Sequence, residues 1–244
     1  FENEFIPQID VLESLVDENT VAILYNFPSN PTGATITSEQ RDELLAFAKR
    51  HDLWIITDEV YDRIVYDVGH VSFLGTGYDQ TLLINSFSKT FAMTGWRIGY
   101  ICCPNQDTMR QIIKMQYYIT ACSNDAMQYA VLTAFDEASN YPEEMAKEFQ
   151  ARRDLICDRL NAMPGVSCHV PKGAFYVFPK MEVPGLSSEE LAIELLHGGV
   201  LASPGSAFGE SGEGHIRFAY TISRDDISAG MDKVEAVLRR LRGE

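Results

Sequence analysis

A lysine, several hydroxyl groups and an arginine lie close together in the segment SFSKTFAMTGWRIGY, residues 86–100. Lys89 follows TLLINSF, an apolar run that is typical of a buried strand. Ser86 precedes this lysine, and Arg97 follows it. A charged amine at the end of a buried strand costs free energy unless it has a function or a partner. The segment is therefore a candidate functional site.

Reactive side chains also follow the two preceding apolar runs, VAILYN and LWIIT. Asn30 comes after the first run, and Asp58 and Tyr61 come after the second. In open α/β sheets, ligands bind at the carboxyl ends of strands, so we expect these side chains to lie near Ser86 and Lys89. Each residue alone has a structural explanation, Asp58 as a helix cap and Tyr61 as a core residue. Their positions at consecutive strand ends favour a common site.

The elements that would position these side chains form an alternating pattern. Apolar runs predict four strands, at residues 21–26, 53–57, 81–87 and 97–103. An amphipathic helix, capped by Thr37 or Ser38, separates the first two strands. Apolar strands that alternate with helices are typical of an α/β sheet covered on both faces.

The pattern changes along the second half of the chain. Residues 105–160 give a helical signal that is broken near Ser123 and Pro142. After it, GVSCHV and GAFYVFP predict a pair of strands, SSEELAIELLHGG a capped helix, GHIRFAYT a strand, and SRDDISAGMDKVEAVLRRLR a closing helix. We therefore predict two domains, a large one over residues 1–150 and a smaller α+β one over residues 151–244.

Composition and charge narrow the possible partners. The chain has 244 residues and a formal net charge of −15, which is spread along the sequence. Such a surface repels nucleic acid and anionic membranes, so we expect neither as a partner. The five cysteines match no zinc-ligand spacing, and we predict no metal site. Reduced thiols and the lack of a long apolar run favour a cytoplasmic protein.

Three motifs, in this order, resemble the cofactor-binding signature of fold-type I pyridoxal-phosphate enzymes: NFPSNPTG, DEVYD and SFSKTFAMTGWRIG. They are most similar to the class I/II aminotransferases, in the branch with prokaryotic aspartate and aromatic aminotransferases. PKGAFYVFP, SPGSAFG and GHIRFAYT also match, so the resemblance covers essentially the whole chain. It implies part of a large mixed, mainly parallel sheet domain, followed by a smaller C-terminal α+β domain.

The resemblance implies that Lys89, Asp58 and Tyr61 are catalytic and that the cofactor is pyridoxal 5′-phosphate. Lys89 would hold the cofactor as a Schiff base, which requires a neutral amine and hence a lowered pKa. Asp58 would keep the pyridine nitrogen protonated, so that the ring withdraws electrons from a carbanion. Asn30 and Tyr61 would donate hydrogen bonds to the phenolic oxygen of the ring.

The resemblance also implies which residues bind the anionic groups of the cofactor and of the substrate. Ser86 and Arg97 would bind the cofactor phosphate through a hydrogen bond and a charge-assisted fork. Arg217, in GHIRFAYT, would bind the carboxylate of the amino acid, which a planar guanidinium suits better than an ammonium does.

These roles imply transamination between an amino acid and a 2-oxo acid, in the amino acid metabolism of a homodimeric enzyme. Two alternatives stay open. A β-eliminating lyase of the same fold carries a similar lysine motif, and an aminotransferase-like effector domain of a transcription regulator would need a DNA-binding extension ahead of Phe1. The chain starts with FENEFIPQID, without Met. We therefore expect a fragment that lacks an amino-terminal part, including a Gly-rich phosphate loop and an aromatic residue that stacks on the cofactor ring.

Overall fold

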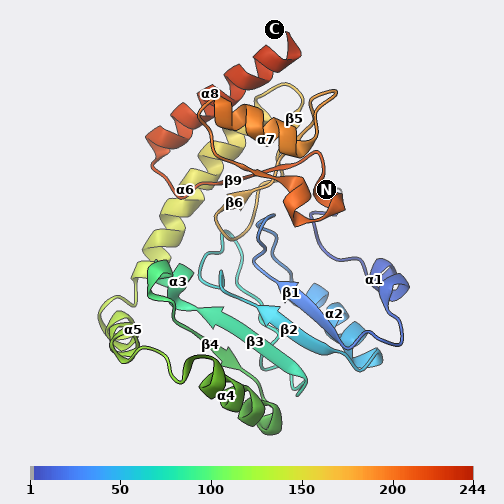
Figure 1. Ribbon diagram of the computed structural model, residues 1–244, viewed down its shortest axis with the longest axis vertical. Coiled ribbons are helices and arrows are strands. Elements are labelled where there is room, and N and C mark those ends of the chain that lie inside the picture. Colours follow the sequence, from blue (N-terminus) through green and yellow to red (C-terminus); the bar gives the residue numbers. More distant parts are fainter. Residues whose placement is uncertain (1–2, 244) are drawn as a thin grey trace. The chain divides into compact units, whose positions relative to one another are not determined.

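The computed structural model describes residues 3–243, which form two compact units (Figure 1). The sheet unit comprises residues 6–28 and 35–145, and the C-terminal unit comprises residues 3–5, 29–34 and 146–243. The sequence places a domain boundary at residue 150, whereas the chain leaves the sheet unit after Met145. The segment Ser29–Ala34 groups with the C-terminal unit, although it lies far from it in the sequence.

The sheet unit is built on four strands that lie in chain order: β1 (Ala22–Asn26), β2 (Trp54–Asp58), β3 (Thr81–Ser86) and β4 (Gly99–Cys102). The first three strands are parallel, and β4 runs antiparallel to β3. The four predicted strands are therefore confirmed, and the sheet is mixed but mainly parallel. Because β2 and β3 are parallel neighbours, their carboxyl ends, with Asp58 and Ser86, meet at one edge of the sheet.

Helices connect and cover these strands: α1 (Ile9–Leu15), α2 (Ser38–Arg50), α3 (Phe87–Thr90), the 3₁₀ turn η1 (Thr94–Trp96), α4 (Gln106–Thr120) and α5 (Asp125–Glu137). Thr37 caps α2 in a capping box with Gln40, as the sequence predicts. The long helix α6 (Tyr141–Asn161) carries the chain from the sheet unit into the C-terminal unit. Pro142 lies in its first turn, where a helix tolerates the missing N–H.

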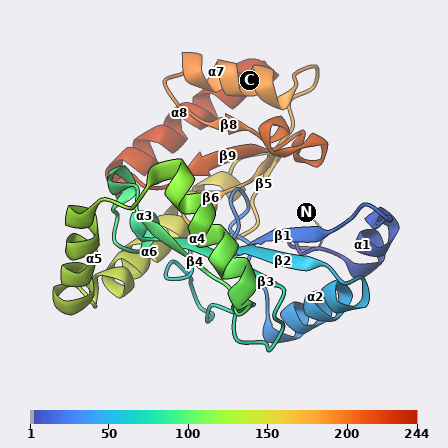
Figure 2. The ribbon, with the colours of Figure 1, turned by 60° about the horizontal axis from the view of Figure 1, so that its bottom comes forward.

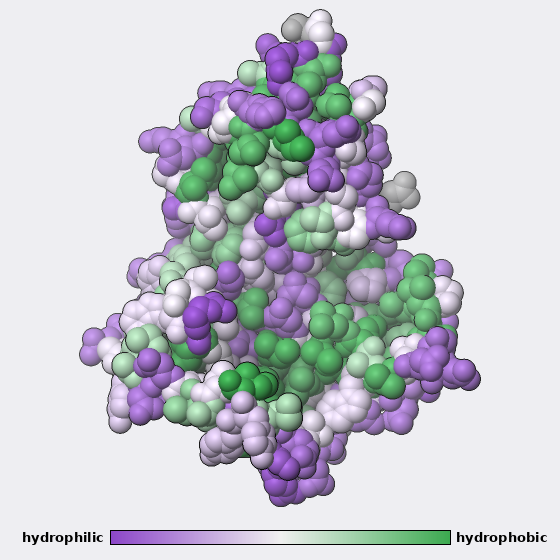
Figure 3. Space-filling model, viewed as in Figure 1, coloured by the Kyte–Doolittle hydropathy of each residue, from purple (hydrophilic) through white to green (hydrophobic). Residues whose placement is uncertain are grey.

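Burial in the sheet unit is one-sided. The core includes Phe47 of α2 and Ile55 of β2, which are almost fully buried. On other parts of the sheet, Leu24 of β1 is 68% exposed and Tyr100 of β4 is 40% exposed. Figure 2 shows α4 beside β3 and β4, and Figure 3 shows apolar residues exposed over the sheet. The expected cover on both faces is therefore incomplete within the described residues.

After α6, the C-terminal unit continues with short strands, helices and 3₁₀ turns: β5 (Val166–Ser167), β6 (Tyr176–Val177), β7 (Lys180–Met181), α7 (Ser188–His197), β8 (Ser203–Pro204), η2 (Gly205–Phe208), η3 (Glu210–Gly212), β9 (Ile216–Ala219) and α8 (Arg224–Arg242). The strand order is β6-β9-β8 in one sheet and β5-β7 in the other. Ser187 caps α7 and Ser223 caps α8.

One predicted pairing in this unit is wrong. The sequence paired GVSCHV with GAFYVFP, but β5 pairs with β7, just after the second motif, and β6 pairs with β9. Tyr176 and Val177 are buried, and their backbones pair with a strand about forty residues later in the chain. The apolar run nearest in the sequence was therefore not the partner of β6.

Neither a membrane-spanning helix nor a metal cluster is found within residues 3–243. No described helix is both long and apolar enough to cross a bilayer. No group of three or more His, Cys, Asp or Glu side chains there could hold a metal ion. The five cysteines are free thiols, of which Cys103, Cys157 and Cys168 are buried.

Candidate active site

Ser86, Lys89 and Arg97 lie where β3 turns into the short helix α3 and then into β4. Ser86 is the last residue of β3, and its hydroxyl accepts a hydrogen bond from the backbone N–H of Ser88 at 3.3 Å, which caps α3. Arg97 ends the turn η1 in a left-handed conformation, with φ 54°, and its guanidinium donates to the carbonyl of Thr94 at 2.8 Å. These local contacts place a hydroxyl, an amine and a guanidinium within one turn region.

The strand that follows Arg97 packs directly against Ser86. Gly99 is the register partner of Ser86, and a Cβ at Gly99 would lie 2.6 Å from the carbonyl oxygen of Asn85. Any larger side chain would therefore push β4 away from β3. The glycine in WRIGY keeps the two strands close at the candidate site.

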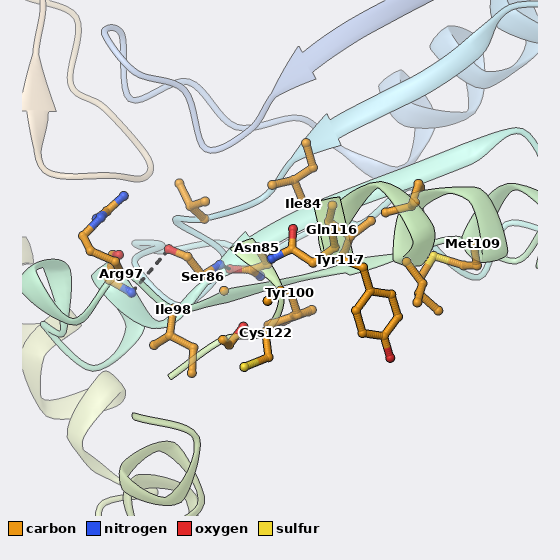
Figure 4. Close-up of a pocket in the computed structure, with 18 residues that line it drawn as sticks. Ile84, Asn85, Ser86, Arg97, Ile98, Tyr100, Met109, Gln116, Tyr117 and Cys122 are labelled. Carbon is orange, nitrogen blue, oxygen red and sulfur yellow. Dashed lines mark hydrogen bonds between the residues drawn. The ribbon is translucent and has the colours of Figure 1, made fainter. Parts of the chain in front are cut away.

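A cavity of about 730 Å³ opens beside this turn, between the ends of β3 and β4 and the helix α4. Ser86 and Arg97 line one end of it, and apolar side chains such as Met109 and Tyr117 line the other (Figure 4). A cavity with a hydroxyl and a guanidinium at one end suits a ligand that carries an anionic group.

Lys89 and Tyr61 face one another in the sheet unit. The ammonium nitrogen of Lys89 lies 5.8 Å from the centroid of the Tyr61 ring, which is almost fully buried. Burial lowers the pKa of Lys89, and the positive charge of Arg97 lowers this pKa further. Both effects increase the fraction of neutral, nucleophilic amine at neutral pH.

Asp58 lies half-buried at the end of β2. Its backbone carbonyl accepts a hydrogen bond from the side-chain amide of Asn26 at 3.1 Å, and this bond ties Asp58 to the end of β1. Burial raises the pKa of Asp58, a hydrogen bond from the N–H of Val60 lowers it, and the charge of Glu59 raises it. A cationic group beside Asp58 would therefore stabilise the carboxylate form.

Asn30 and Arg217 lie in the C-terminal unit, where they contact each other. The guanidinium of Arg217 donates to Asn30 Oδ1 at 2.8 Å and to Ser203 Oγ at 3.0 Å. It also lies 4.7 Å from the ring centroid of Tyr176 and 5.0 Å from that of Phe208. Within the described residues, its buried Nε has no hydrogen-bond partner. The guanidinium is thus held in place by two hydrogen bonds and two aromatic rings.

Sequence reasoning missed three of these neighbours of Arg217: Ser203, Tyr176 and Phe208. These three residues lie in the motifs PKGAFYVFP and SPGSAFG, which resemble those of the family. The motifs alone do not show which of their residues contact Arg217. Ser203 and Arg217 are register partners on β8 and β9, so strand pairing brings them together.

The loop that carries Asn30 is anchored by Gly33, which has φ +67°. The carbonyl of Gly33 accepts hydrogen bonds from the N–H groups of Lys172 and Gly173, at 3.2 and 2.9 Å. A Cβ at Gly33 would lie 2.3 Å from the Cβ of Pro171. This loop therefore requires glycine for both its conformation and its close packing.

We expect Gly33→Ala to lower the free energy of unfolding by about 3 kcal/mol or more, because it adds backbone strain and a steric overlap. Urea denaturation measures this change. Gly230→Ala is the control, since Gly230 lies in α8 where an added Cβ would have no neighbour within 4 Å, and alanine there should stabilise by up to about 1 kcal/mol. Equal effects of the two substitutions would contradict the role of Gly33.

Comparison with known proteins identifies the family. The chain matches the model of the class I and II aminotransferases over residues 2–234. It belongs to this family. An aspartate aminotransferase of Pyrococcus abyssi and an aromatic-amino-acid aminotransferase of Thermococcus litoralis are each 41% identical to it, over 98% of this chain and 62% of theirs. This aminotransferase-family chain thus spans about 62% of the length of these curated relatives.

Solved structures place the fold in the same family. An aromatic aminotransferase from Pyrococcus horikoshii superposes with a TM-score of 0.93 at 38% identity, over 99% of this chain and 66% of that one. An aspartate aminotransferase from Thermus thermophilus, solved with maleate, gives a TM-score of 0.90 at 32% identity, over 97% and 62%. The resemblance seen in the motifs and the predicted fold class are therefore confirmed.

Proposed function

We propose that the protein transfers an amino group between an amino acid and a 2-oxo acid, using pyridoxal 5′-phosphate bound at Lys89. The observation that carries this proposal is the environment of Lys89. Lys89 lies in α3, directly after β3. Its amine faces Tyr61 and has a lowered pKa, and Arg97 follows it in the chain and lines the cavity. No observation favours the lyase or the regulator, and the four relatives named above are aminotransferases.

The side chains of the sheet unit fit this cofactor by their chemistry. Lys89 offers an amine for covalent attachment, and Asp58 offers a carboxylate that a protonated ring nitrogen would keep ionised. Ser86 and Arg97 offer a hydroxyl and a guanidinium for the phosphate, and Tyr61 a phenol for the ring oxygen. When bound, the cofactor supplies an electron-withdrawing ring that stabilises a carbanion at the substrate Cα.

The chain's own residues would then bind the substrate and move its proton. Lys89 Nζ would take the proton from the substrate Cα as a general base and would deliver it, as a general acid, to the C4′ carbon of the cofactor, which receives the amino group. Its lowered pKa suits both directions at neutral pH. Arg217 would hold the substrate carboxylate, with Asn30, Ser203 and the two aromatic rings fixing the guanidinium.

Assembly, domains and location complete the proposal. We assign residues 1–150 to a large cofactor-binding domain and residues 151–244 to a small domain, in a cytoplasmic homodimer of amino acid metabolism. Exposed apolar side chains on α4 and α5, including Tyr118 and Tyr129, support an interface between subunits.

A titration of the protein with pyridoxal phosphate tests the proposal. We expect a covalent adduct at Lys89, located by borohydride reduction and mass spectrometry, and release of 2-oxo acid when amino acids are added. Aspartate and the aromatic amino acids are the first to try, because the names of the relatives mention them. A protein that binds the cofactor but releases ammonia without an acceptor would be a lyase instead.

Arg217→Lys is expected to raise the KM for amino acids and 2-oxo acids by about tenfold to a hundredfold, because an ammonium cannot make two parallel hydrogen bonds to a carboxylate. Steady-state kinetics measures this change, and the absorbance of the bound cofactor should stay unchanged. The control is Arg240→Lys, at an exposed pair with Glu194 in the same unit. A simple amine without a carboxylate should react equally well with both proteins; a matching loss for that amine would rule out carboxylate binding by Arg217.

A further inference from the structure

Glu59 is a buried acidic residue beside Asp58 that the proposed reaction does not use. Only 3% of its surface is exposed, although it carries a carboxylate. A buried carboxylate is costly unless several hydrogen bonds or a cation stabilise it. The neighbours of Glu59 must therefore stabilise its carboxylate.

Both oxygens of the Glu59 carboxylate have hydrogen-bond partners. Its Oε1 accepts from Thr57 Oγ1 at 3.0 Å, from Ser72 Oγ at 3.0 Å and from the N–H of Phe73 at 3.2 Å. Its Oε2 lies 2.7 Å from His70 Nε2, where an N–H on that nitrogen donates. The carboxylate thus ties segment 70–73 to the end of β2.

The backbone of Glu59 begins the turn that carries Tyr61. The N–H of Glu59 donates to the carbonyl of Ile84 on β3 at 2.9 Å, and the carbonyl of Glu59 accepts from the N–H of Asp62 at 3.0 Å. Asp58 precedes this turn and Tyr61 lies within it. Hydrogen bonds of both the side chain and the backbone of Glu59 therefore fix the chain between Asp58 and Tyr61.

We propose that Glu59 and His70 are positioning residues, a hydrogen-bonded pair that holds Asp58 and Tyr61 in their places for the reaction. The inference rests on the proposed function. The pair acts through hydrogen bonds that fix the turn and through charge next to Asp58. A second carboxyl, that of Asp62, also interacts with His70: burial raises the pKa of Asp62, and the charges of His70 and Arg63 lower it.

The first test measures Asp58 itself in the cofactor-free protein. Glu59→Gln removes one negative charge beside Asp58, so the pKa of Asp58, followed by ¹³C NMR of its carboxyl carbon, should fall. Glu13→Gln is the control, because Glu13 forms a similar 2.7 Å contact with His51 at the surface. An Asp58 titration that is the same in Glu59→Gln and in wild type would overturn the charge effect.

The second test uses His70, whose side chain is 19% exposed and therefore tolerates substitution better than Glu59. His70→Leu removes the donor to Glu59 and should weaken pyridoxal phosphate binding about tenfold, the size of effect expected when one hydrogen bond to a charged group is lost. His70→Gln keeps an N–H donor and should recover most of the affinity. The control is His51→Leu, and equal affinities for His70→Leu and this control would overturn the positioning role.

The two tests fail in distinguishable ways. If the wild-type protein does not bind pyridoxal phosphate, the proposed function fails, and the Asp58 titration still decides whether Glu59 acts on Asp58. If Glu59→Gln does not fold, the cofactor affinities of His70→Leu and His70→Gln decide whether the pair has a positioning role. Thermal unfolding of every variant separates a loss of fold from a loss of position.

Discussion

Lys89→Ala is expected to abolish covalent attachment of pyridoxal phosphate and to lower turnover by at least about 10⁴-fold. The substitution removes both the amine that binds the cofactor and the base that moves the Cα proton. The environment of Lys89 supports this size of effect, because burial and the charge of Arg97 lower its pKa and make the amine reactive at neutral pH. Absorbance of the bound cofactor and single-turnover kinetics measure the two losses.

A second lysine provides the control for this prediction. Lys49→Ala changes an exposed lysine on α2 of the same unit, where its ammonium lies 5.5 Å from the Tyr78 ring. We expect this variant to keep the adduct and the turnover of the wild type. Reduced cofactor found on another lysine in the Lys89→Ala protein would show that the assignment of Lys89 is wrong.

Asp58→Ala should lower turnover by about 10²- to 10³-fold while the protein stays folded. A fixed charge that stabilises a developing charge is commonly worth about 3–4 kcal/mol in the transition state. Loss of this carboxylate should not weaken the fold at neutral pH. The folded-state pKa of Asp58 is raised, so its ionised form destabilises the fold once the pH exceeds the unfolded-state pKa.

The raised pKa of Asp58 also predicts how the stability of the fold changes with pH. Wild type should lose stability relative to Asp58→Ala as the pH rises from below the unfolded-state pKa of Asp58 through its raised folded-state pKa. Urea denaturation at several pH values tests this. Asp79→Ala, at an exposed position, is the control and should keep the turnover of the wild type. Turnover of Asp58→Ala within a few-fold of wild type would exclude Asp58 as the partner of the ring nitrogen.

Much of the sheet unit could be predicted from local sequence patterns. The apolar runs, the capping box at Thr37 and the break before α5 each depend on residues that are neighbours in the sequence. The candidate site residues could be found for a related reason. In a parallel sheet the strand ends share one edge, so residues after consecutive strands, such as Asp58 and Ser86, are brought together by topology alone.

The C-terminal unit was less predictable, because its strands are only two to four residues long. A strand of two residues has no alternation that could define its partner or its buried face. The pairing of β5 with β7 therefore followed from packing, which the local pattern did not contain.

The sequence by itself determined the family, the mainly parallel sheet and the order of the reactive side chains along it, because motifs and hydrophobic periodicity are local properties of the chain. Only the tertiary structure decided which distant residues meet. It brought Asn30 to Arg217, 187 positions later, and His70 to the buried carboxylate of Glu59. Such contacts depend on how loops and strands pack in three dimensions, and the hydrogen bonds that result have no counterpart in the spacing of the residues.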